Sequence, residues 1–270
     1  LYQLIKATGR EMAGVSAQRT TASISAIFSD ETTNFTNYIR RYHYDRDNNL
    51  VRIQHAAPAT GNNYSTEITV SSRSNRAVSK TLTDNPDEVE ALFDTAGNQL
   101  RLKQVTPVTR DSVSTSDREW YRYDAGGQRV IKATNQMSGN NQRQIRQLYL
   151  SELESVMVSL NGIQTEIYHR IIVGNAQVLP WQLGKPTAIT NDSIRYSHRD
   201  LTGNSTLETD KEGLVISREE FYPFGETAIW LARAQQEADY KTYRYSGKER
   251  DATGLYYYGF RYYQPWVGRW

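Results

Sequence analysis

Tyr121-Arg122-Tyr123-Asp124-Ala125-Gly126-Gly127 is the stretch of sequence that decides the fold. Its Tyr-x-Tyr part has a period of two, which places both rings on one face of a β-strand. Its Asp-x-x-Gly part predicts a turn, because the Asp carboxylate can accept hydrogen bonds from backbone N–H groups two residues on and Gly tolerates a positive φ. An apolar run then begins at Val130. The whole unit therefore predicts a β-hairpin.

The same unit recurs along the chain, which indicates a repeat architecture. Its copies, some of them looser, are Tyr42–Leu50, Leu92–Asn98, Tyr121–Gly127, Tyr196–Gly203, Thr209–Leu214 and Tyr243–Gly247. A series of hairpins makes a long antiparallel sheet. We interpret Asp45, Asp94 and Asp124 as turn formers and not as catalytic acids.

Other segments favour strands as well. Asn161-Gly162 is the strongest short hairpin signal, and it joins the β-rich runs Glu154–Leu160 and Ile163–Val173. Thr66–Val70 predicts a further strand. The repeat tyrosines are expected to pack in rows between successive hairpins, since cross-strand aromatic pairs stabilise sheets. These tyrosines are Tyr42, Tyr44, Tyr121, Tyr123, Tyr243 and Tyr245.

Helix signals are few, so the predicted fold class is all-β with few short helices. Asp84–Glu90 combines a cap, a proline and early acids, and it predicts one or two helical turns. Ala228–Tyr240 predicts either a second short helix or a loop that crosses the sheet. The polar stretches Pro58–Ser65 and Gln136–Gln144 predict loops.

Composition excludes several classes of protein. The 270 residues carry 32 Lys and Arg against 30 Asp and Glu, so a net charge of +2 gives no overall basic field for nucleic acid. Mean hydropathy is −0.70, and no run approaches the roughly 18 apolar residues of a membrane span. The lack of cysteine excludes disulfides, thiol catalysis and Cys-based zinc sites. We expect no nucleic-acid partner, no direct membrane insertion and no cofactor.

The densest signal lies at the carboxyl end. From Lys241 to Trp270, six Lys and Arg stand against two Asp and Glu, with seven Tyr and two Trp between them. This mixture fits a single-strand nucleic-acid platform or a sugar-stacking surface. It also fits a strand pair whose rings pack inward under arginine stems, which we favour.

The segment Tyr243–Trp270 closely resembles the hallmark of the Rhs-associated core region, and the upstream units resemble the tyrosine–aspartate (YD) repeats of the same superfamily. The similarity is closer still to the C subunit of bacterial insecticidal Tc toxin complexes. It rests on the stretches Leu1–Glu11, Ser72–Arg76, Asp117–Tyr123, Asn191–Tyr196 and Tyr222–Gly225. Between Asn98 and Thr106 the chain is shorter than the family pattern by the length of a hairpin. Because the sequence starts at Leu1 without Met and stops at Trp270, we expect it to be a piece of a longer chain.

The resemblance implies a spiralling antiparallel sheet that forms part of a hollow, cocoon-like shell. Residues 1–240 would be the YD/Rhs repeat shell segment. Residues 241–270 would start the Rhs-associated core region, whose autoprotease part follows Trp270. In this family the C subunit builds the wall with a B subunit and encloses its own C-terminal toxin domain as cargo. The A subunit is an indirect partner, and the complex is secreted or extracellular.

The resemblance also implies a role for Arg261. Family members release the toxin domain by self-cleavage that resembles aspartyl-protease chemistry, in which two carboxylates share a proton. The family's aspartates follow the Gly-Arg-Trp motif, here Gly268–Trp270, so this chain by itself is expected not to be an enzyme. Arg261 matches the upstream arginine of the motif and is expected to hold one aspartate ionised. The alternative is that Arg261 only stacks on Tyr262 or Trp266.

Other chemistry finds little support in the sequence. The four histidines, His43, His55, His169 and His198, have no metal-binding spacing. Glu219-Glu220 and the pair Glu249 and Asp251 are acids that a glycosidase could use. The first pair is poorly suited, because adjacent acids in a strand point to opposite faces. The alternative function is a cell-surface YD-repeat module for adhesion or carbohydrate binding.

Overall fold

The computed structural model describes residues 3–12, 35–93, 118–138, 140–189 and 193–270. Within these ranges antiparallel strands dominate, as the sequence predicts. The expected turn at Asp94 and the shortened stretch 98–106 lie outside the described residues.

The first sheet follows chain order. Its five strands are β1 (Lys6–Met12), β2 (Phe35–Tyr44), β3 (Leu50–Ala56), β4 (Tyr64–Val70) and β5 (Ala77–Ser79). The strand predicted at Thr66–Val70 is β4. The predicted loop Pro58–Ser65 is a turn that ends where β4 begins at Tyr64.

The second sheet is larger, and its strands again pair mostly with their neighbours in sequence. They are β6 (Arg118–Tyr123), β7 (Arg129–Ser138), β8 (Asn141–Leu150), β9 (Leu153–Leu160), β10 (Ile163–Val173), β11 (Ala176–Leu179), β12 (Trp181–Leu183), β13 (Ser193–Arg199), β14 (Ser205–Thr209), β15 (Val215–Phe221) and β16 (Thr227–Ala232). Strand β10 pairs with β9, β11 and β12.

Helices are short, as predicted. The stretch around Asp84–Glu90 forms a 3-10 helix, η1 (Pro86–Leu92), capped by the Asn85 side chain. The only α-helix in the described ranges is α1 (Gln235–Ala238), and η3 (Tyr245–Gly247) is a single 3-10 turn. No helix in the described part of the chain has the length and apolar character needed to cross a membrane.

One expectation is wrong and another holds only in part, because the short helix α1 (Gln235–Ala238) does form within Ala228–Tyr240. Most of Gln136–Gln144 is not a loop, because β7 and β8 continue through Gln136↔Arg143 and Met137↔Gln142. These residues form strands through backbone hydrogen bonds. The polar character of their side chains, which suggested a loop, gives no information about that pairing. The start of Ala228–Tyr240 is β16, whose six residues are all buried. A strand buried on both faces loses the alternation that separates it from a helix.

The predicted hairpin turns that fall within the described residues are confirmed. The carboxylates of four aspartates each accept hydrogen bonds of 2.8–3.1 Å from the N–H groups two and four residues on: Asp45, Asp124, Asp200 and Asp210. Asn161 and Gly162 both have positive φ, 51° and 82°, as the tight hairpin between β9 and β10 requires.

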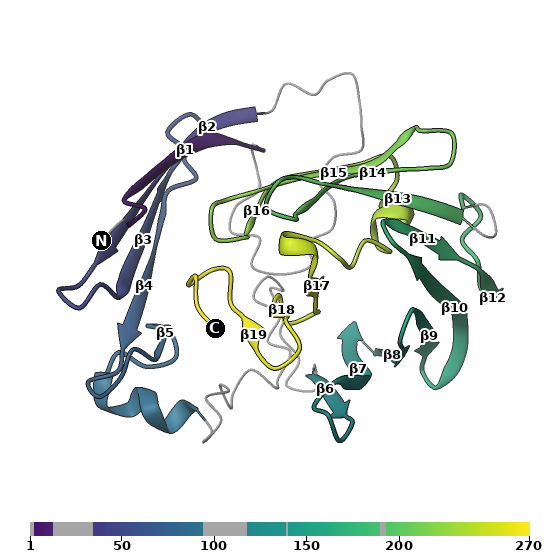
Figure 1. Cartoon of the computed structure of the whole chain (residues 1–270), viewed down its shortest axis with the longest axis horizontal. Coiled ribbons are helices and arrows are strands. Elements are labelled where there is room, and N and C mark those ends of the chain that lie inside the picture. Colours follow the sequence, from purple (N-terminus) through teal and green to yellow (C-terminus); the bar gives the residue numbers. More distant parts are fainter. Residues whose placement is uncertain (1–2, 13–34, 94–117, 139, 190–192) are drawn as a thin grey trace.

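The two sheets form an arch (Figure 1). Their edge strands β1 and β16 lie side by side at the top, where Met12 packs against Ile229 and Leu231. The last residues, yellow in Figure 1, occupy the concave side of the arch and contain the small third sheet. Its strands are β17 (Glu249–Arg250), β18 (Tyr256–Tyr257) and β19 (Tyr262–Tyr263).

Candidate functional site: a C-terminal segment held by buried ion pairs

We call residues 241–270 the C-terminal segment. Two five-residue turns shape it: the N–H of Arg244 donates to the carbonyl of Lys248, and the N–H of Asp251 donates to that of Leu255. The hairpins upstream show the same bond, for example from Asp124 to Gln128. The segment therefore continues the hairpin pattern of the repeats on the inner side of the arch.

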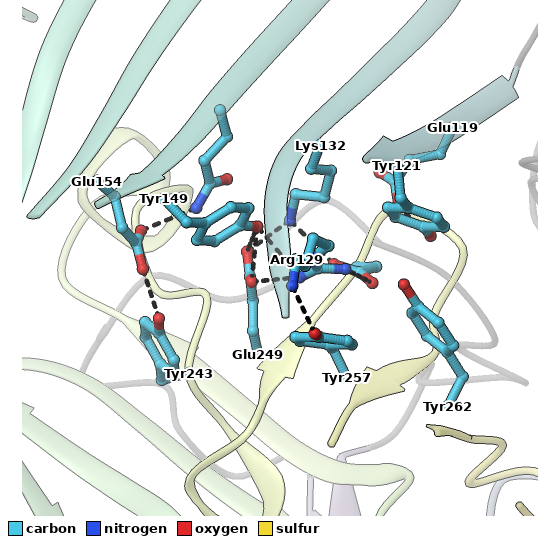
Figure 2. A network of polar contacts seen from close by, with 12 residues as sticks. Glu119, Tyr121, Arg129, Lys132, Tyr149, Glu154, Tyr243, Glu249, Tyr257 and Tyr262 are labelled. Carbon is cyan, nitrogen blue, oxygen red and sulfur yellow. Dashed lines mark hydrogen bonds and ion pairs between the residues drawn. The ribbon is translucent and has the colours of Figure 1, made fainter. Parts of the chain in front are cut away.

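A buried ion cluster attaches the segment to β7 (Figure 2). Arg129 Nη1 lies 2.7 Å from Asp251 Oδ2, and Arg129 Nη2 lies 2.5 Å from Glu249 Oε2. Lys132 Nζ lies 2.5 Å from Glu249 Oε1 and 2.9 Å from Asp251 Oδ1. All four side chains are at most 8% exposed. Removal of both charges from water costs free energy, so a buried ion pair is stable only when its partners are at short distance and well aligned.

Tyrosines complete the cluster. The Tyr149 hydroxyl from β8 donates to Glu249, and the Arg129 guanidinium lies 4.0 Å from the centre of the Tyr257 ring. The Tyr257 hydroxyl accepts a hydrogen bond from the Arg129 backbone N–H. The cluster therefore joins β7 and β8 to β17 and β18.

Glu249 in the cluster and Glu119 beside it have opposite pKa shifts. Burial alone would raise the pKa of Glu249, but the charges of Lys132 and Arg129 lower it to about 2. Glu119 on β6 has no cation at ion-pair distance among the described residues. Burial, reinforced by the charge of Asp251, raises the pKa of Glu119 to about 7.

Further buried pairs follow along the sheet. Glu154 on β9 pairs with Arg170 on β10. Glu154 also accepts a hydrogen bond from the Tyr243 hydroxyl (Figure 2). Glu219 on β15 lies 2.7 Å from Arg244 Nη2 and 3.3 Å from Lys241 Nζ. The segment is thus attached by ion pairs at β7 and β15 and by a hydrogen bond at β9.

The first sheet holds the same segment through apolar contacts. Leu255, Trp266 and Val267 pack against a core that includes Tyr42 and Ile53. The C-terminal segment therefore contacts both arms of the arch. Most of its basic and aromatic residues are buried or half-buried in or beside short paired strands, which agrees with the strand-pair interpretation that we favoured from the sequence.

The repeat tyrosines pack, but not with the expected partners. Tyr42 is 3% exposed and meets Phe224 edge-on, with ring centroids 5.1 Å apart. The Tyr121 ring lies 5.3 Å from Tyr262, and the half-exposed Tyr123 shares a hydroxyl hydrogen bond with the same residue. The prediction of rows between successive hairpins is therefore wrong: several of these rings contact distant parts of the chain.

Arg261 lies at the exposed side of the segment. Its guanidinium is 4.3 Å from the centre of the Trp270 ring, and neither Tyr262 nor Trp266 is its stacking partner. The Arg261 carbonyl accepts a hydrogen bond from the Tyr258 N–H, which fixes the backbone of this turn. The side chain is thus held at one face by tryptophan and remains open to solvent.

The acid pair Glu249 and Asp251 does not suit glycoside hydrolysis, since both groups are buried and bound to cations. Among the described residues no cluster of His, Asp and Glu could hold a metal ion. The sequence reasoning missed Arg129 and Lys132. The sequence analysis considered Asp251 only as a possible glycosidase acid. The Asp-x-x-Gly spacing of Asp251 and Gly254 was an available turn signal, but it does not reveal the cations that bind Asp251.

An antiparallel sheet of Asp-x-x-Gly hairpins, with a basic and tyrosine-rich segment on its inner side, defines a shell-forming Rhs-type repeat protein. Residues 61–105 match the family described as Tripartite Tc toxins repeat. The whole chain is 50% identical to Toxin subunit YenC1 and 48% identical to Toxin subunit YenC2, both of Yersinia entomophaga. The chain spans 29% and 30% of the lengths of these relatives.

Solved structures of similar proteins have the same fold over the whole length of this chain. The chain matches the crystal structure of TcdB2-TccC3 without its hypervariable C-terminal region, with a TM-score of 0.88 at 49% identity. It matches a Tc holotoxin pore of Photorhabdus luminescens with a TM-score of 0.90 at 50% identity. Each match covers 100% of this chain and 13% of the solved chain. This chain is an Rhs-repeat protein of the Tc toxin C-subunit type.

Proposed function

We propose that this chain is a wall segment of a Tc toxin C subunit, which encloses its own C-terminal toxin domain together with a B subunit. The observation that carries the proposal is the match of the entire chain, at about half identity, to solved TcdB2-TccC3 structures. The hypervariable C-terminal region named for one such complex supports a variable cargo. The relatives reported above are toxin subunits, which favours this function over the adhesion module.

The geometry supports a wall with a built-in inner layer. We assign residues 1–240, whose described strands form the two large sheets, to the repeat shell. We assign residues 241–270, which lie on the concave side (Figure 1), to the start of the core region. Buried ion pairs hold the C-terminal segment against β7 and β15, which supports a role as part of the wall. Chain that continues past Trp270 would start from this inner side. We place the protein in a secreted complex with the A subunit as an indirect partner.

Co-expression of the full-length protein with its B subunit tests this proposal. We expect both subunits and the C-terminal domain to elute as one complex in size-exclusion chromatography. Added protease should digest the C-terminal domain much more slowly in the complex than after denaturation. A C-terminal domain that is digested at equal rates in both samples would contradict encapsulation.

We also propose that Arg261 supports self-cleavage by pairing with a carboxylate supplied by the longer chain. Its exposed guanidinium, supported on one face by Trp270, is suited to receive such a group. In the full-length protein, Arg261→Ala should fold and assemble yet retain an uncleaved C-terminal domain on a denaturing gel. Arg261→Lys should be impaired as well, because a point charge does not replace a planar fork.

Arg122→Ala is the matched control, since Arg122 also lies over a tryptophan, Trp120, at 5.1 Å. That variant should cleave normally. Complete cleavage in folded Arg261→Ala protein would leave Arg261 a packing residue, while the wall function would stand.

A further inference from the structure

A small pocket lies where the hairpin ends of the second sheet meet the C-terminal segment. Its volume is about 100 Å³, and its walls include Ile172, Gln177, Ser197, Arg199, Ser205 and Tyr243. Since a water molecule fills roughly 30 Å³ of liquid, the pocket has room for a group of a few non-hydrogen atoms.

Gln177 is a buried residue of the pocket lining. Its side chain belongs to a residue that is 7% exposed, and its Oε1 atom is buried without a donor in the described part of the chain. An unmet buried polar atom costs about 1–3 kcal/mol. A half-turn of the amide exchanges Oε1 for Nε2, so this group can equally donate. A ligand or water in the pocket would satisfy it.

Arg199 is an exposed residue of the pocket lining. None of the ion pairs between described residues includes it. Its guanidinium carbon lies 3.4 Å from the position that a Cβ on Gly247 would take. The Arg199 guanidinium therefore lies next to the C-terminal segment. The neighbouring acid, Asp200, is engaged by the N–H groups of Thr202 and Asn204.

The remaining walls define the chemistry of the occupant. Ser197 Oγ and Ser205 Oγ lie 2.7 Å apart, so one hydroxyl donates to the other and the second keeps a hydrogen for another acceptor. Ile172 and the Tyr243 ring are apolar, and the Tyr243 hydroxyl is already bound to Glu154. The pocket thus combines a cation and neutral donors with a hydrocarbon wall.

We propose that this pocket binds one aliphatic carboxylate group. Arg199 supplies the charge, Gln177 and one serine hydroxyl supply hydrogen bonds, and the apolar wall receives the carbon attached to the carboxylate. Phosphate suits the pocket less well, because its several charged oxygens would face Ile172 and Tyr243. The carboxylate can come from a small acid in solution or from an acidic side chain of a partner protein.

Acetate is the probe for the test. We would titrate sodium acetate against the chain at constant ionic strength and follow the side-chain amide resonances of Gln177, assigned with Gln177→Leu, by NMR. We expect a saturable shift. Arg199→Gln should weaken acetate binding by about tenfold or more, since charge-assisted hydrogen bonds are about twice as strong as neutral ones. Arg122→Gln, which removes an exposed arginine outside the pocket, should bind acetate like the parent.

The outcomes separate the possibilities. Acetate that binds the isolated chain but not its complex with the B subunit would assign the carboxylate to a partner side chain. Equal binding in both would assign it to a small acid. A shift that does not saturate, or an equal affinity in Arg199→Gln, would overturn the proposal and leave a pocket filled by water.

Discussion

Glu119 and Glu249 show how position decides the state of a buried carboxyl. Glu249 lies between Lys132 and Arg129, which lower its pKa to about 2 against the effect of burial. Glu119 receives hydrogen bonds from Tyr121 and Thr134 instead, and burial raises its pKa to about 7. Two carboxyls of one network therefore respond to pH in opposite ways.

The first prediction concerns Glu119. Between pH 4.5 and 7 the folded protein holds a proton on Glu119 that the unfolded chain has released, so this group makes unfolding easier as pH rises. Relative to Glu119→Gln, the parent should lose up to about 1.4 kcal/mol of unfolding free energy per pH unit over this range. Urea titrations at several pH values measure it. A difference that is constant with pH would contradict the raised pKa.

Glu249 predicts the opposite slope. Because its folded pKa of about 2 lies below the ordinary value of 4.5, its contribution is complete above pH 4.5 and is lost as pH falls toward 2. The advantage of the parent over Glu249→Gln should therefore shrink as acid is added. An advantage that grows below pH 4.5 would show that Glu249 is not held as an anion.

A matched pair of glycines tests packing against the C-terminal segment. Gly225 and Gly213 both have positive φ, 90° and 80°. A Cβ on Gly225 would lie 2.6 Å from the Tyr245 ring, whereas a Cβ on Gly213 would meet nothing within 4 Å. Both Ala variants carry the backbone cost, so Gly225→Ala should be less stable than Gly213→Ala by about 1–3 kcal/mol. Equal midpoints of thermal unfolding would mean that Tyr245 moves aside freely.

At the scale of elements, the local signals were sufficient for the hairpins. An Asp-x-x-Gly turn or an Asn161-Gly162 pair contains its own hydrogen-bonding partners, so short sequence determines it. The polar ends of β7 and β8 were not predicted as strands. Each residue there is paired through its backbone with a residue of the other strand, and the type of side chain does not reveal that pairing. Strand β16 escaped because it is buried on both faces. The ion cluster escaped because Lys132 and Glu249 are far apart in sequence and only the fold brings them together.

Removal of one charge tests the attachment of the C-terminal segment to β7. Lys132→Met leaves Glu249 and Asp251 with Arg129 as their ion-pair partner from the cluster, and we expect a loss of roughly 3 kcal/mol in unfolding free energy. Lys211→Met, at an exposed lysine, should change stability by less than about 0.5 kcal/mol. The double variant Lys132→Met/Glu249→Gln should recover part of the loss. Purely additive losses would contradict a direct pair.

At the scale of the whole molecule, the arch and its inner segment stabilise each other. The two sheets meet at β1 and β16, and the C-terminal segment contacts both arms through the Leu255 and Trp266 core on one side and the Lys132 cluster on the other. The family resemblance in the sequence predicted this class of protein, and the comparisons confirm it. Neither the repeat pattern nor the composition indicated which inner charges would pair.

Electron cryo-microscopy of the full-length protein bound to its B subunit tests the central claim most directly. We expect residues 35–93 and 118–270 to form a continuous part of the shell wall. We also expect the C-terminal segment to lie on the inner surface, with Glu249 and Asp251 against Arg129 and Lys132. A map in which the C-terminal segment lies outside the wall, or in which the chain forms no wall with the B subunit, would contradict it.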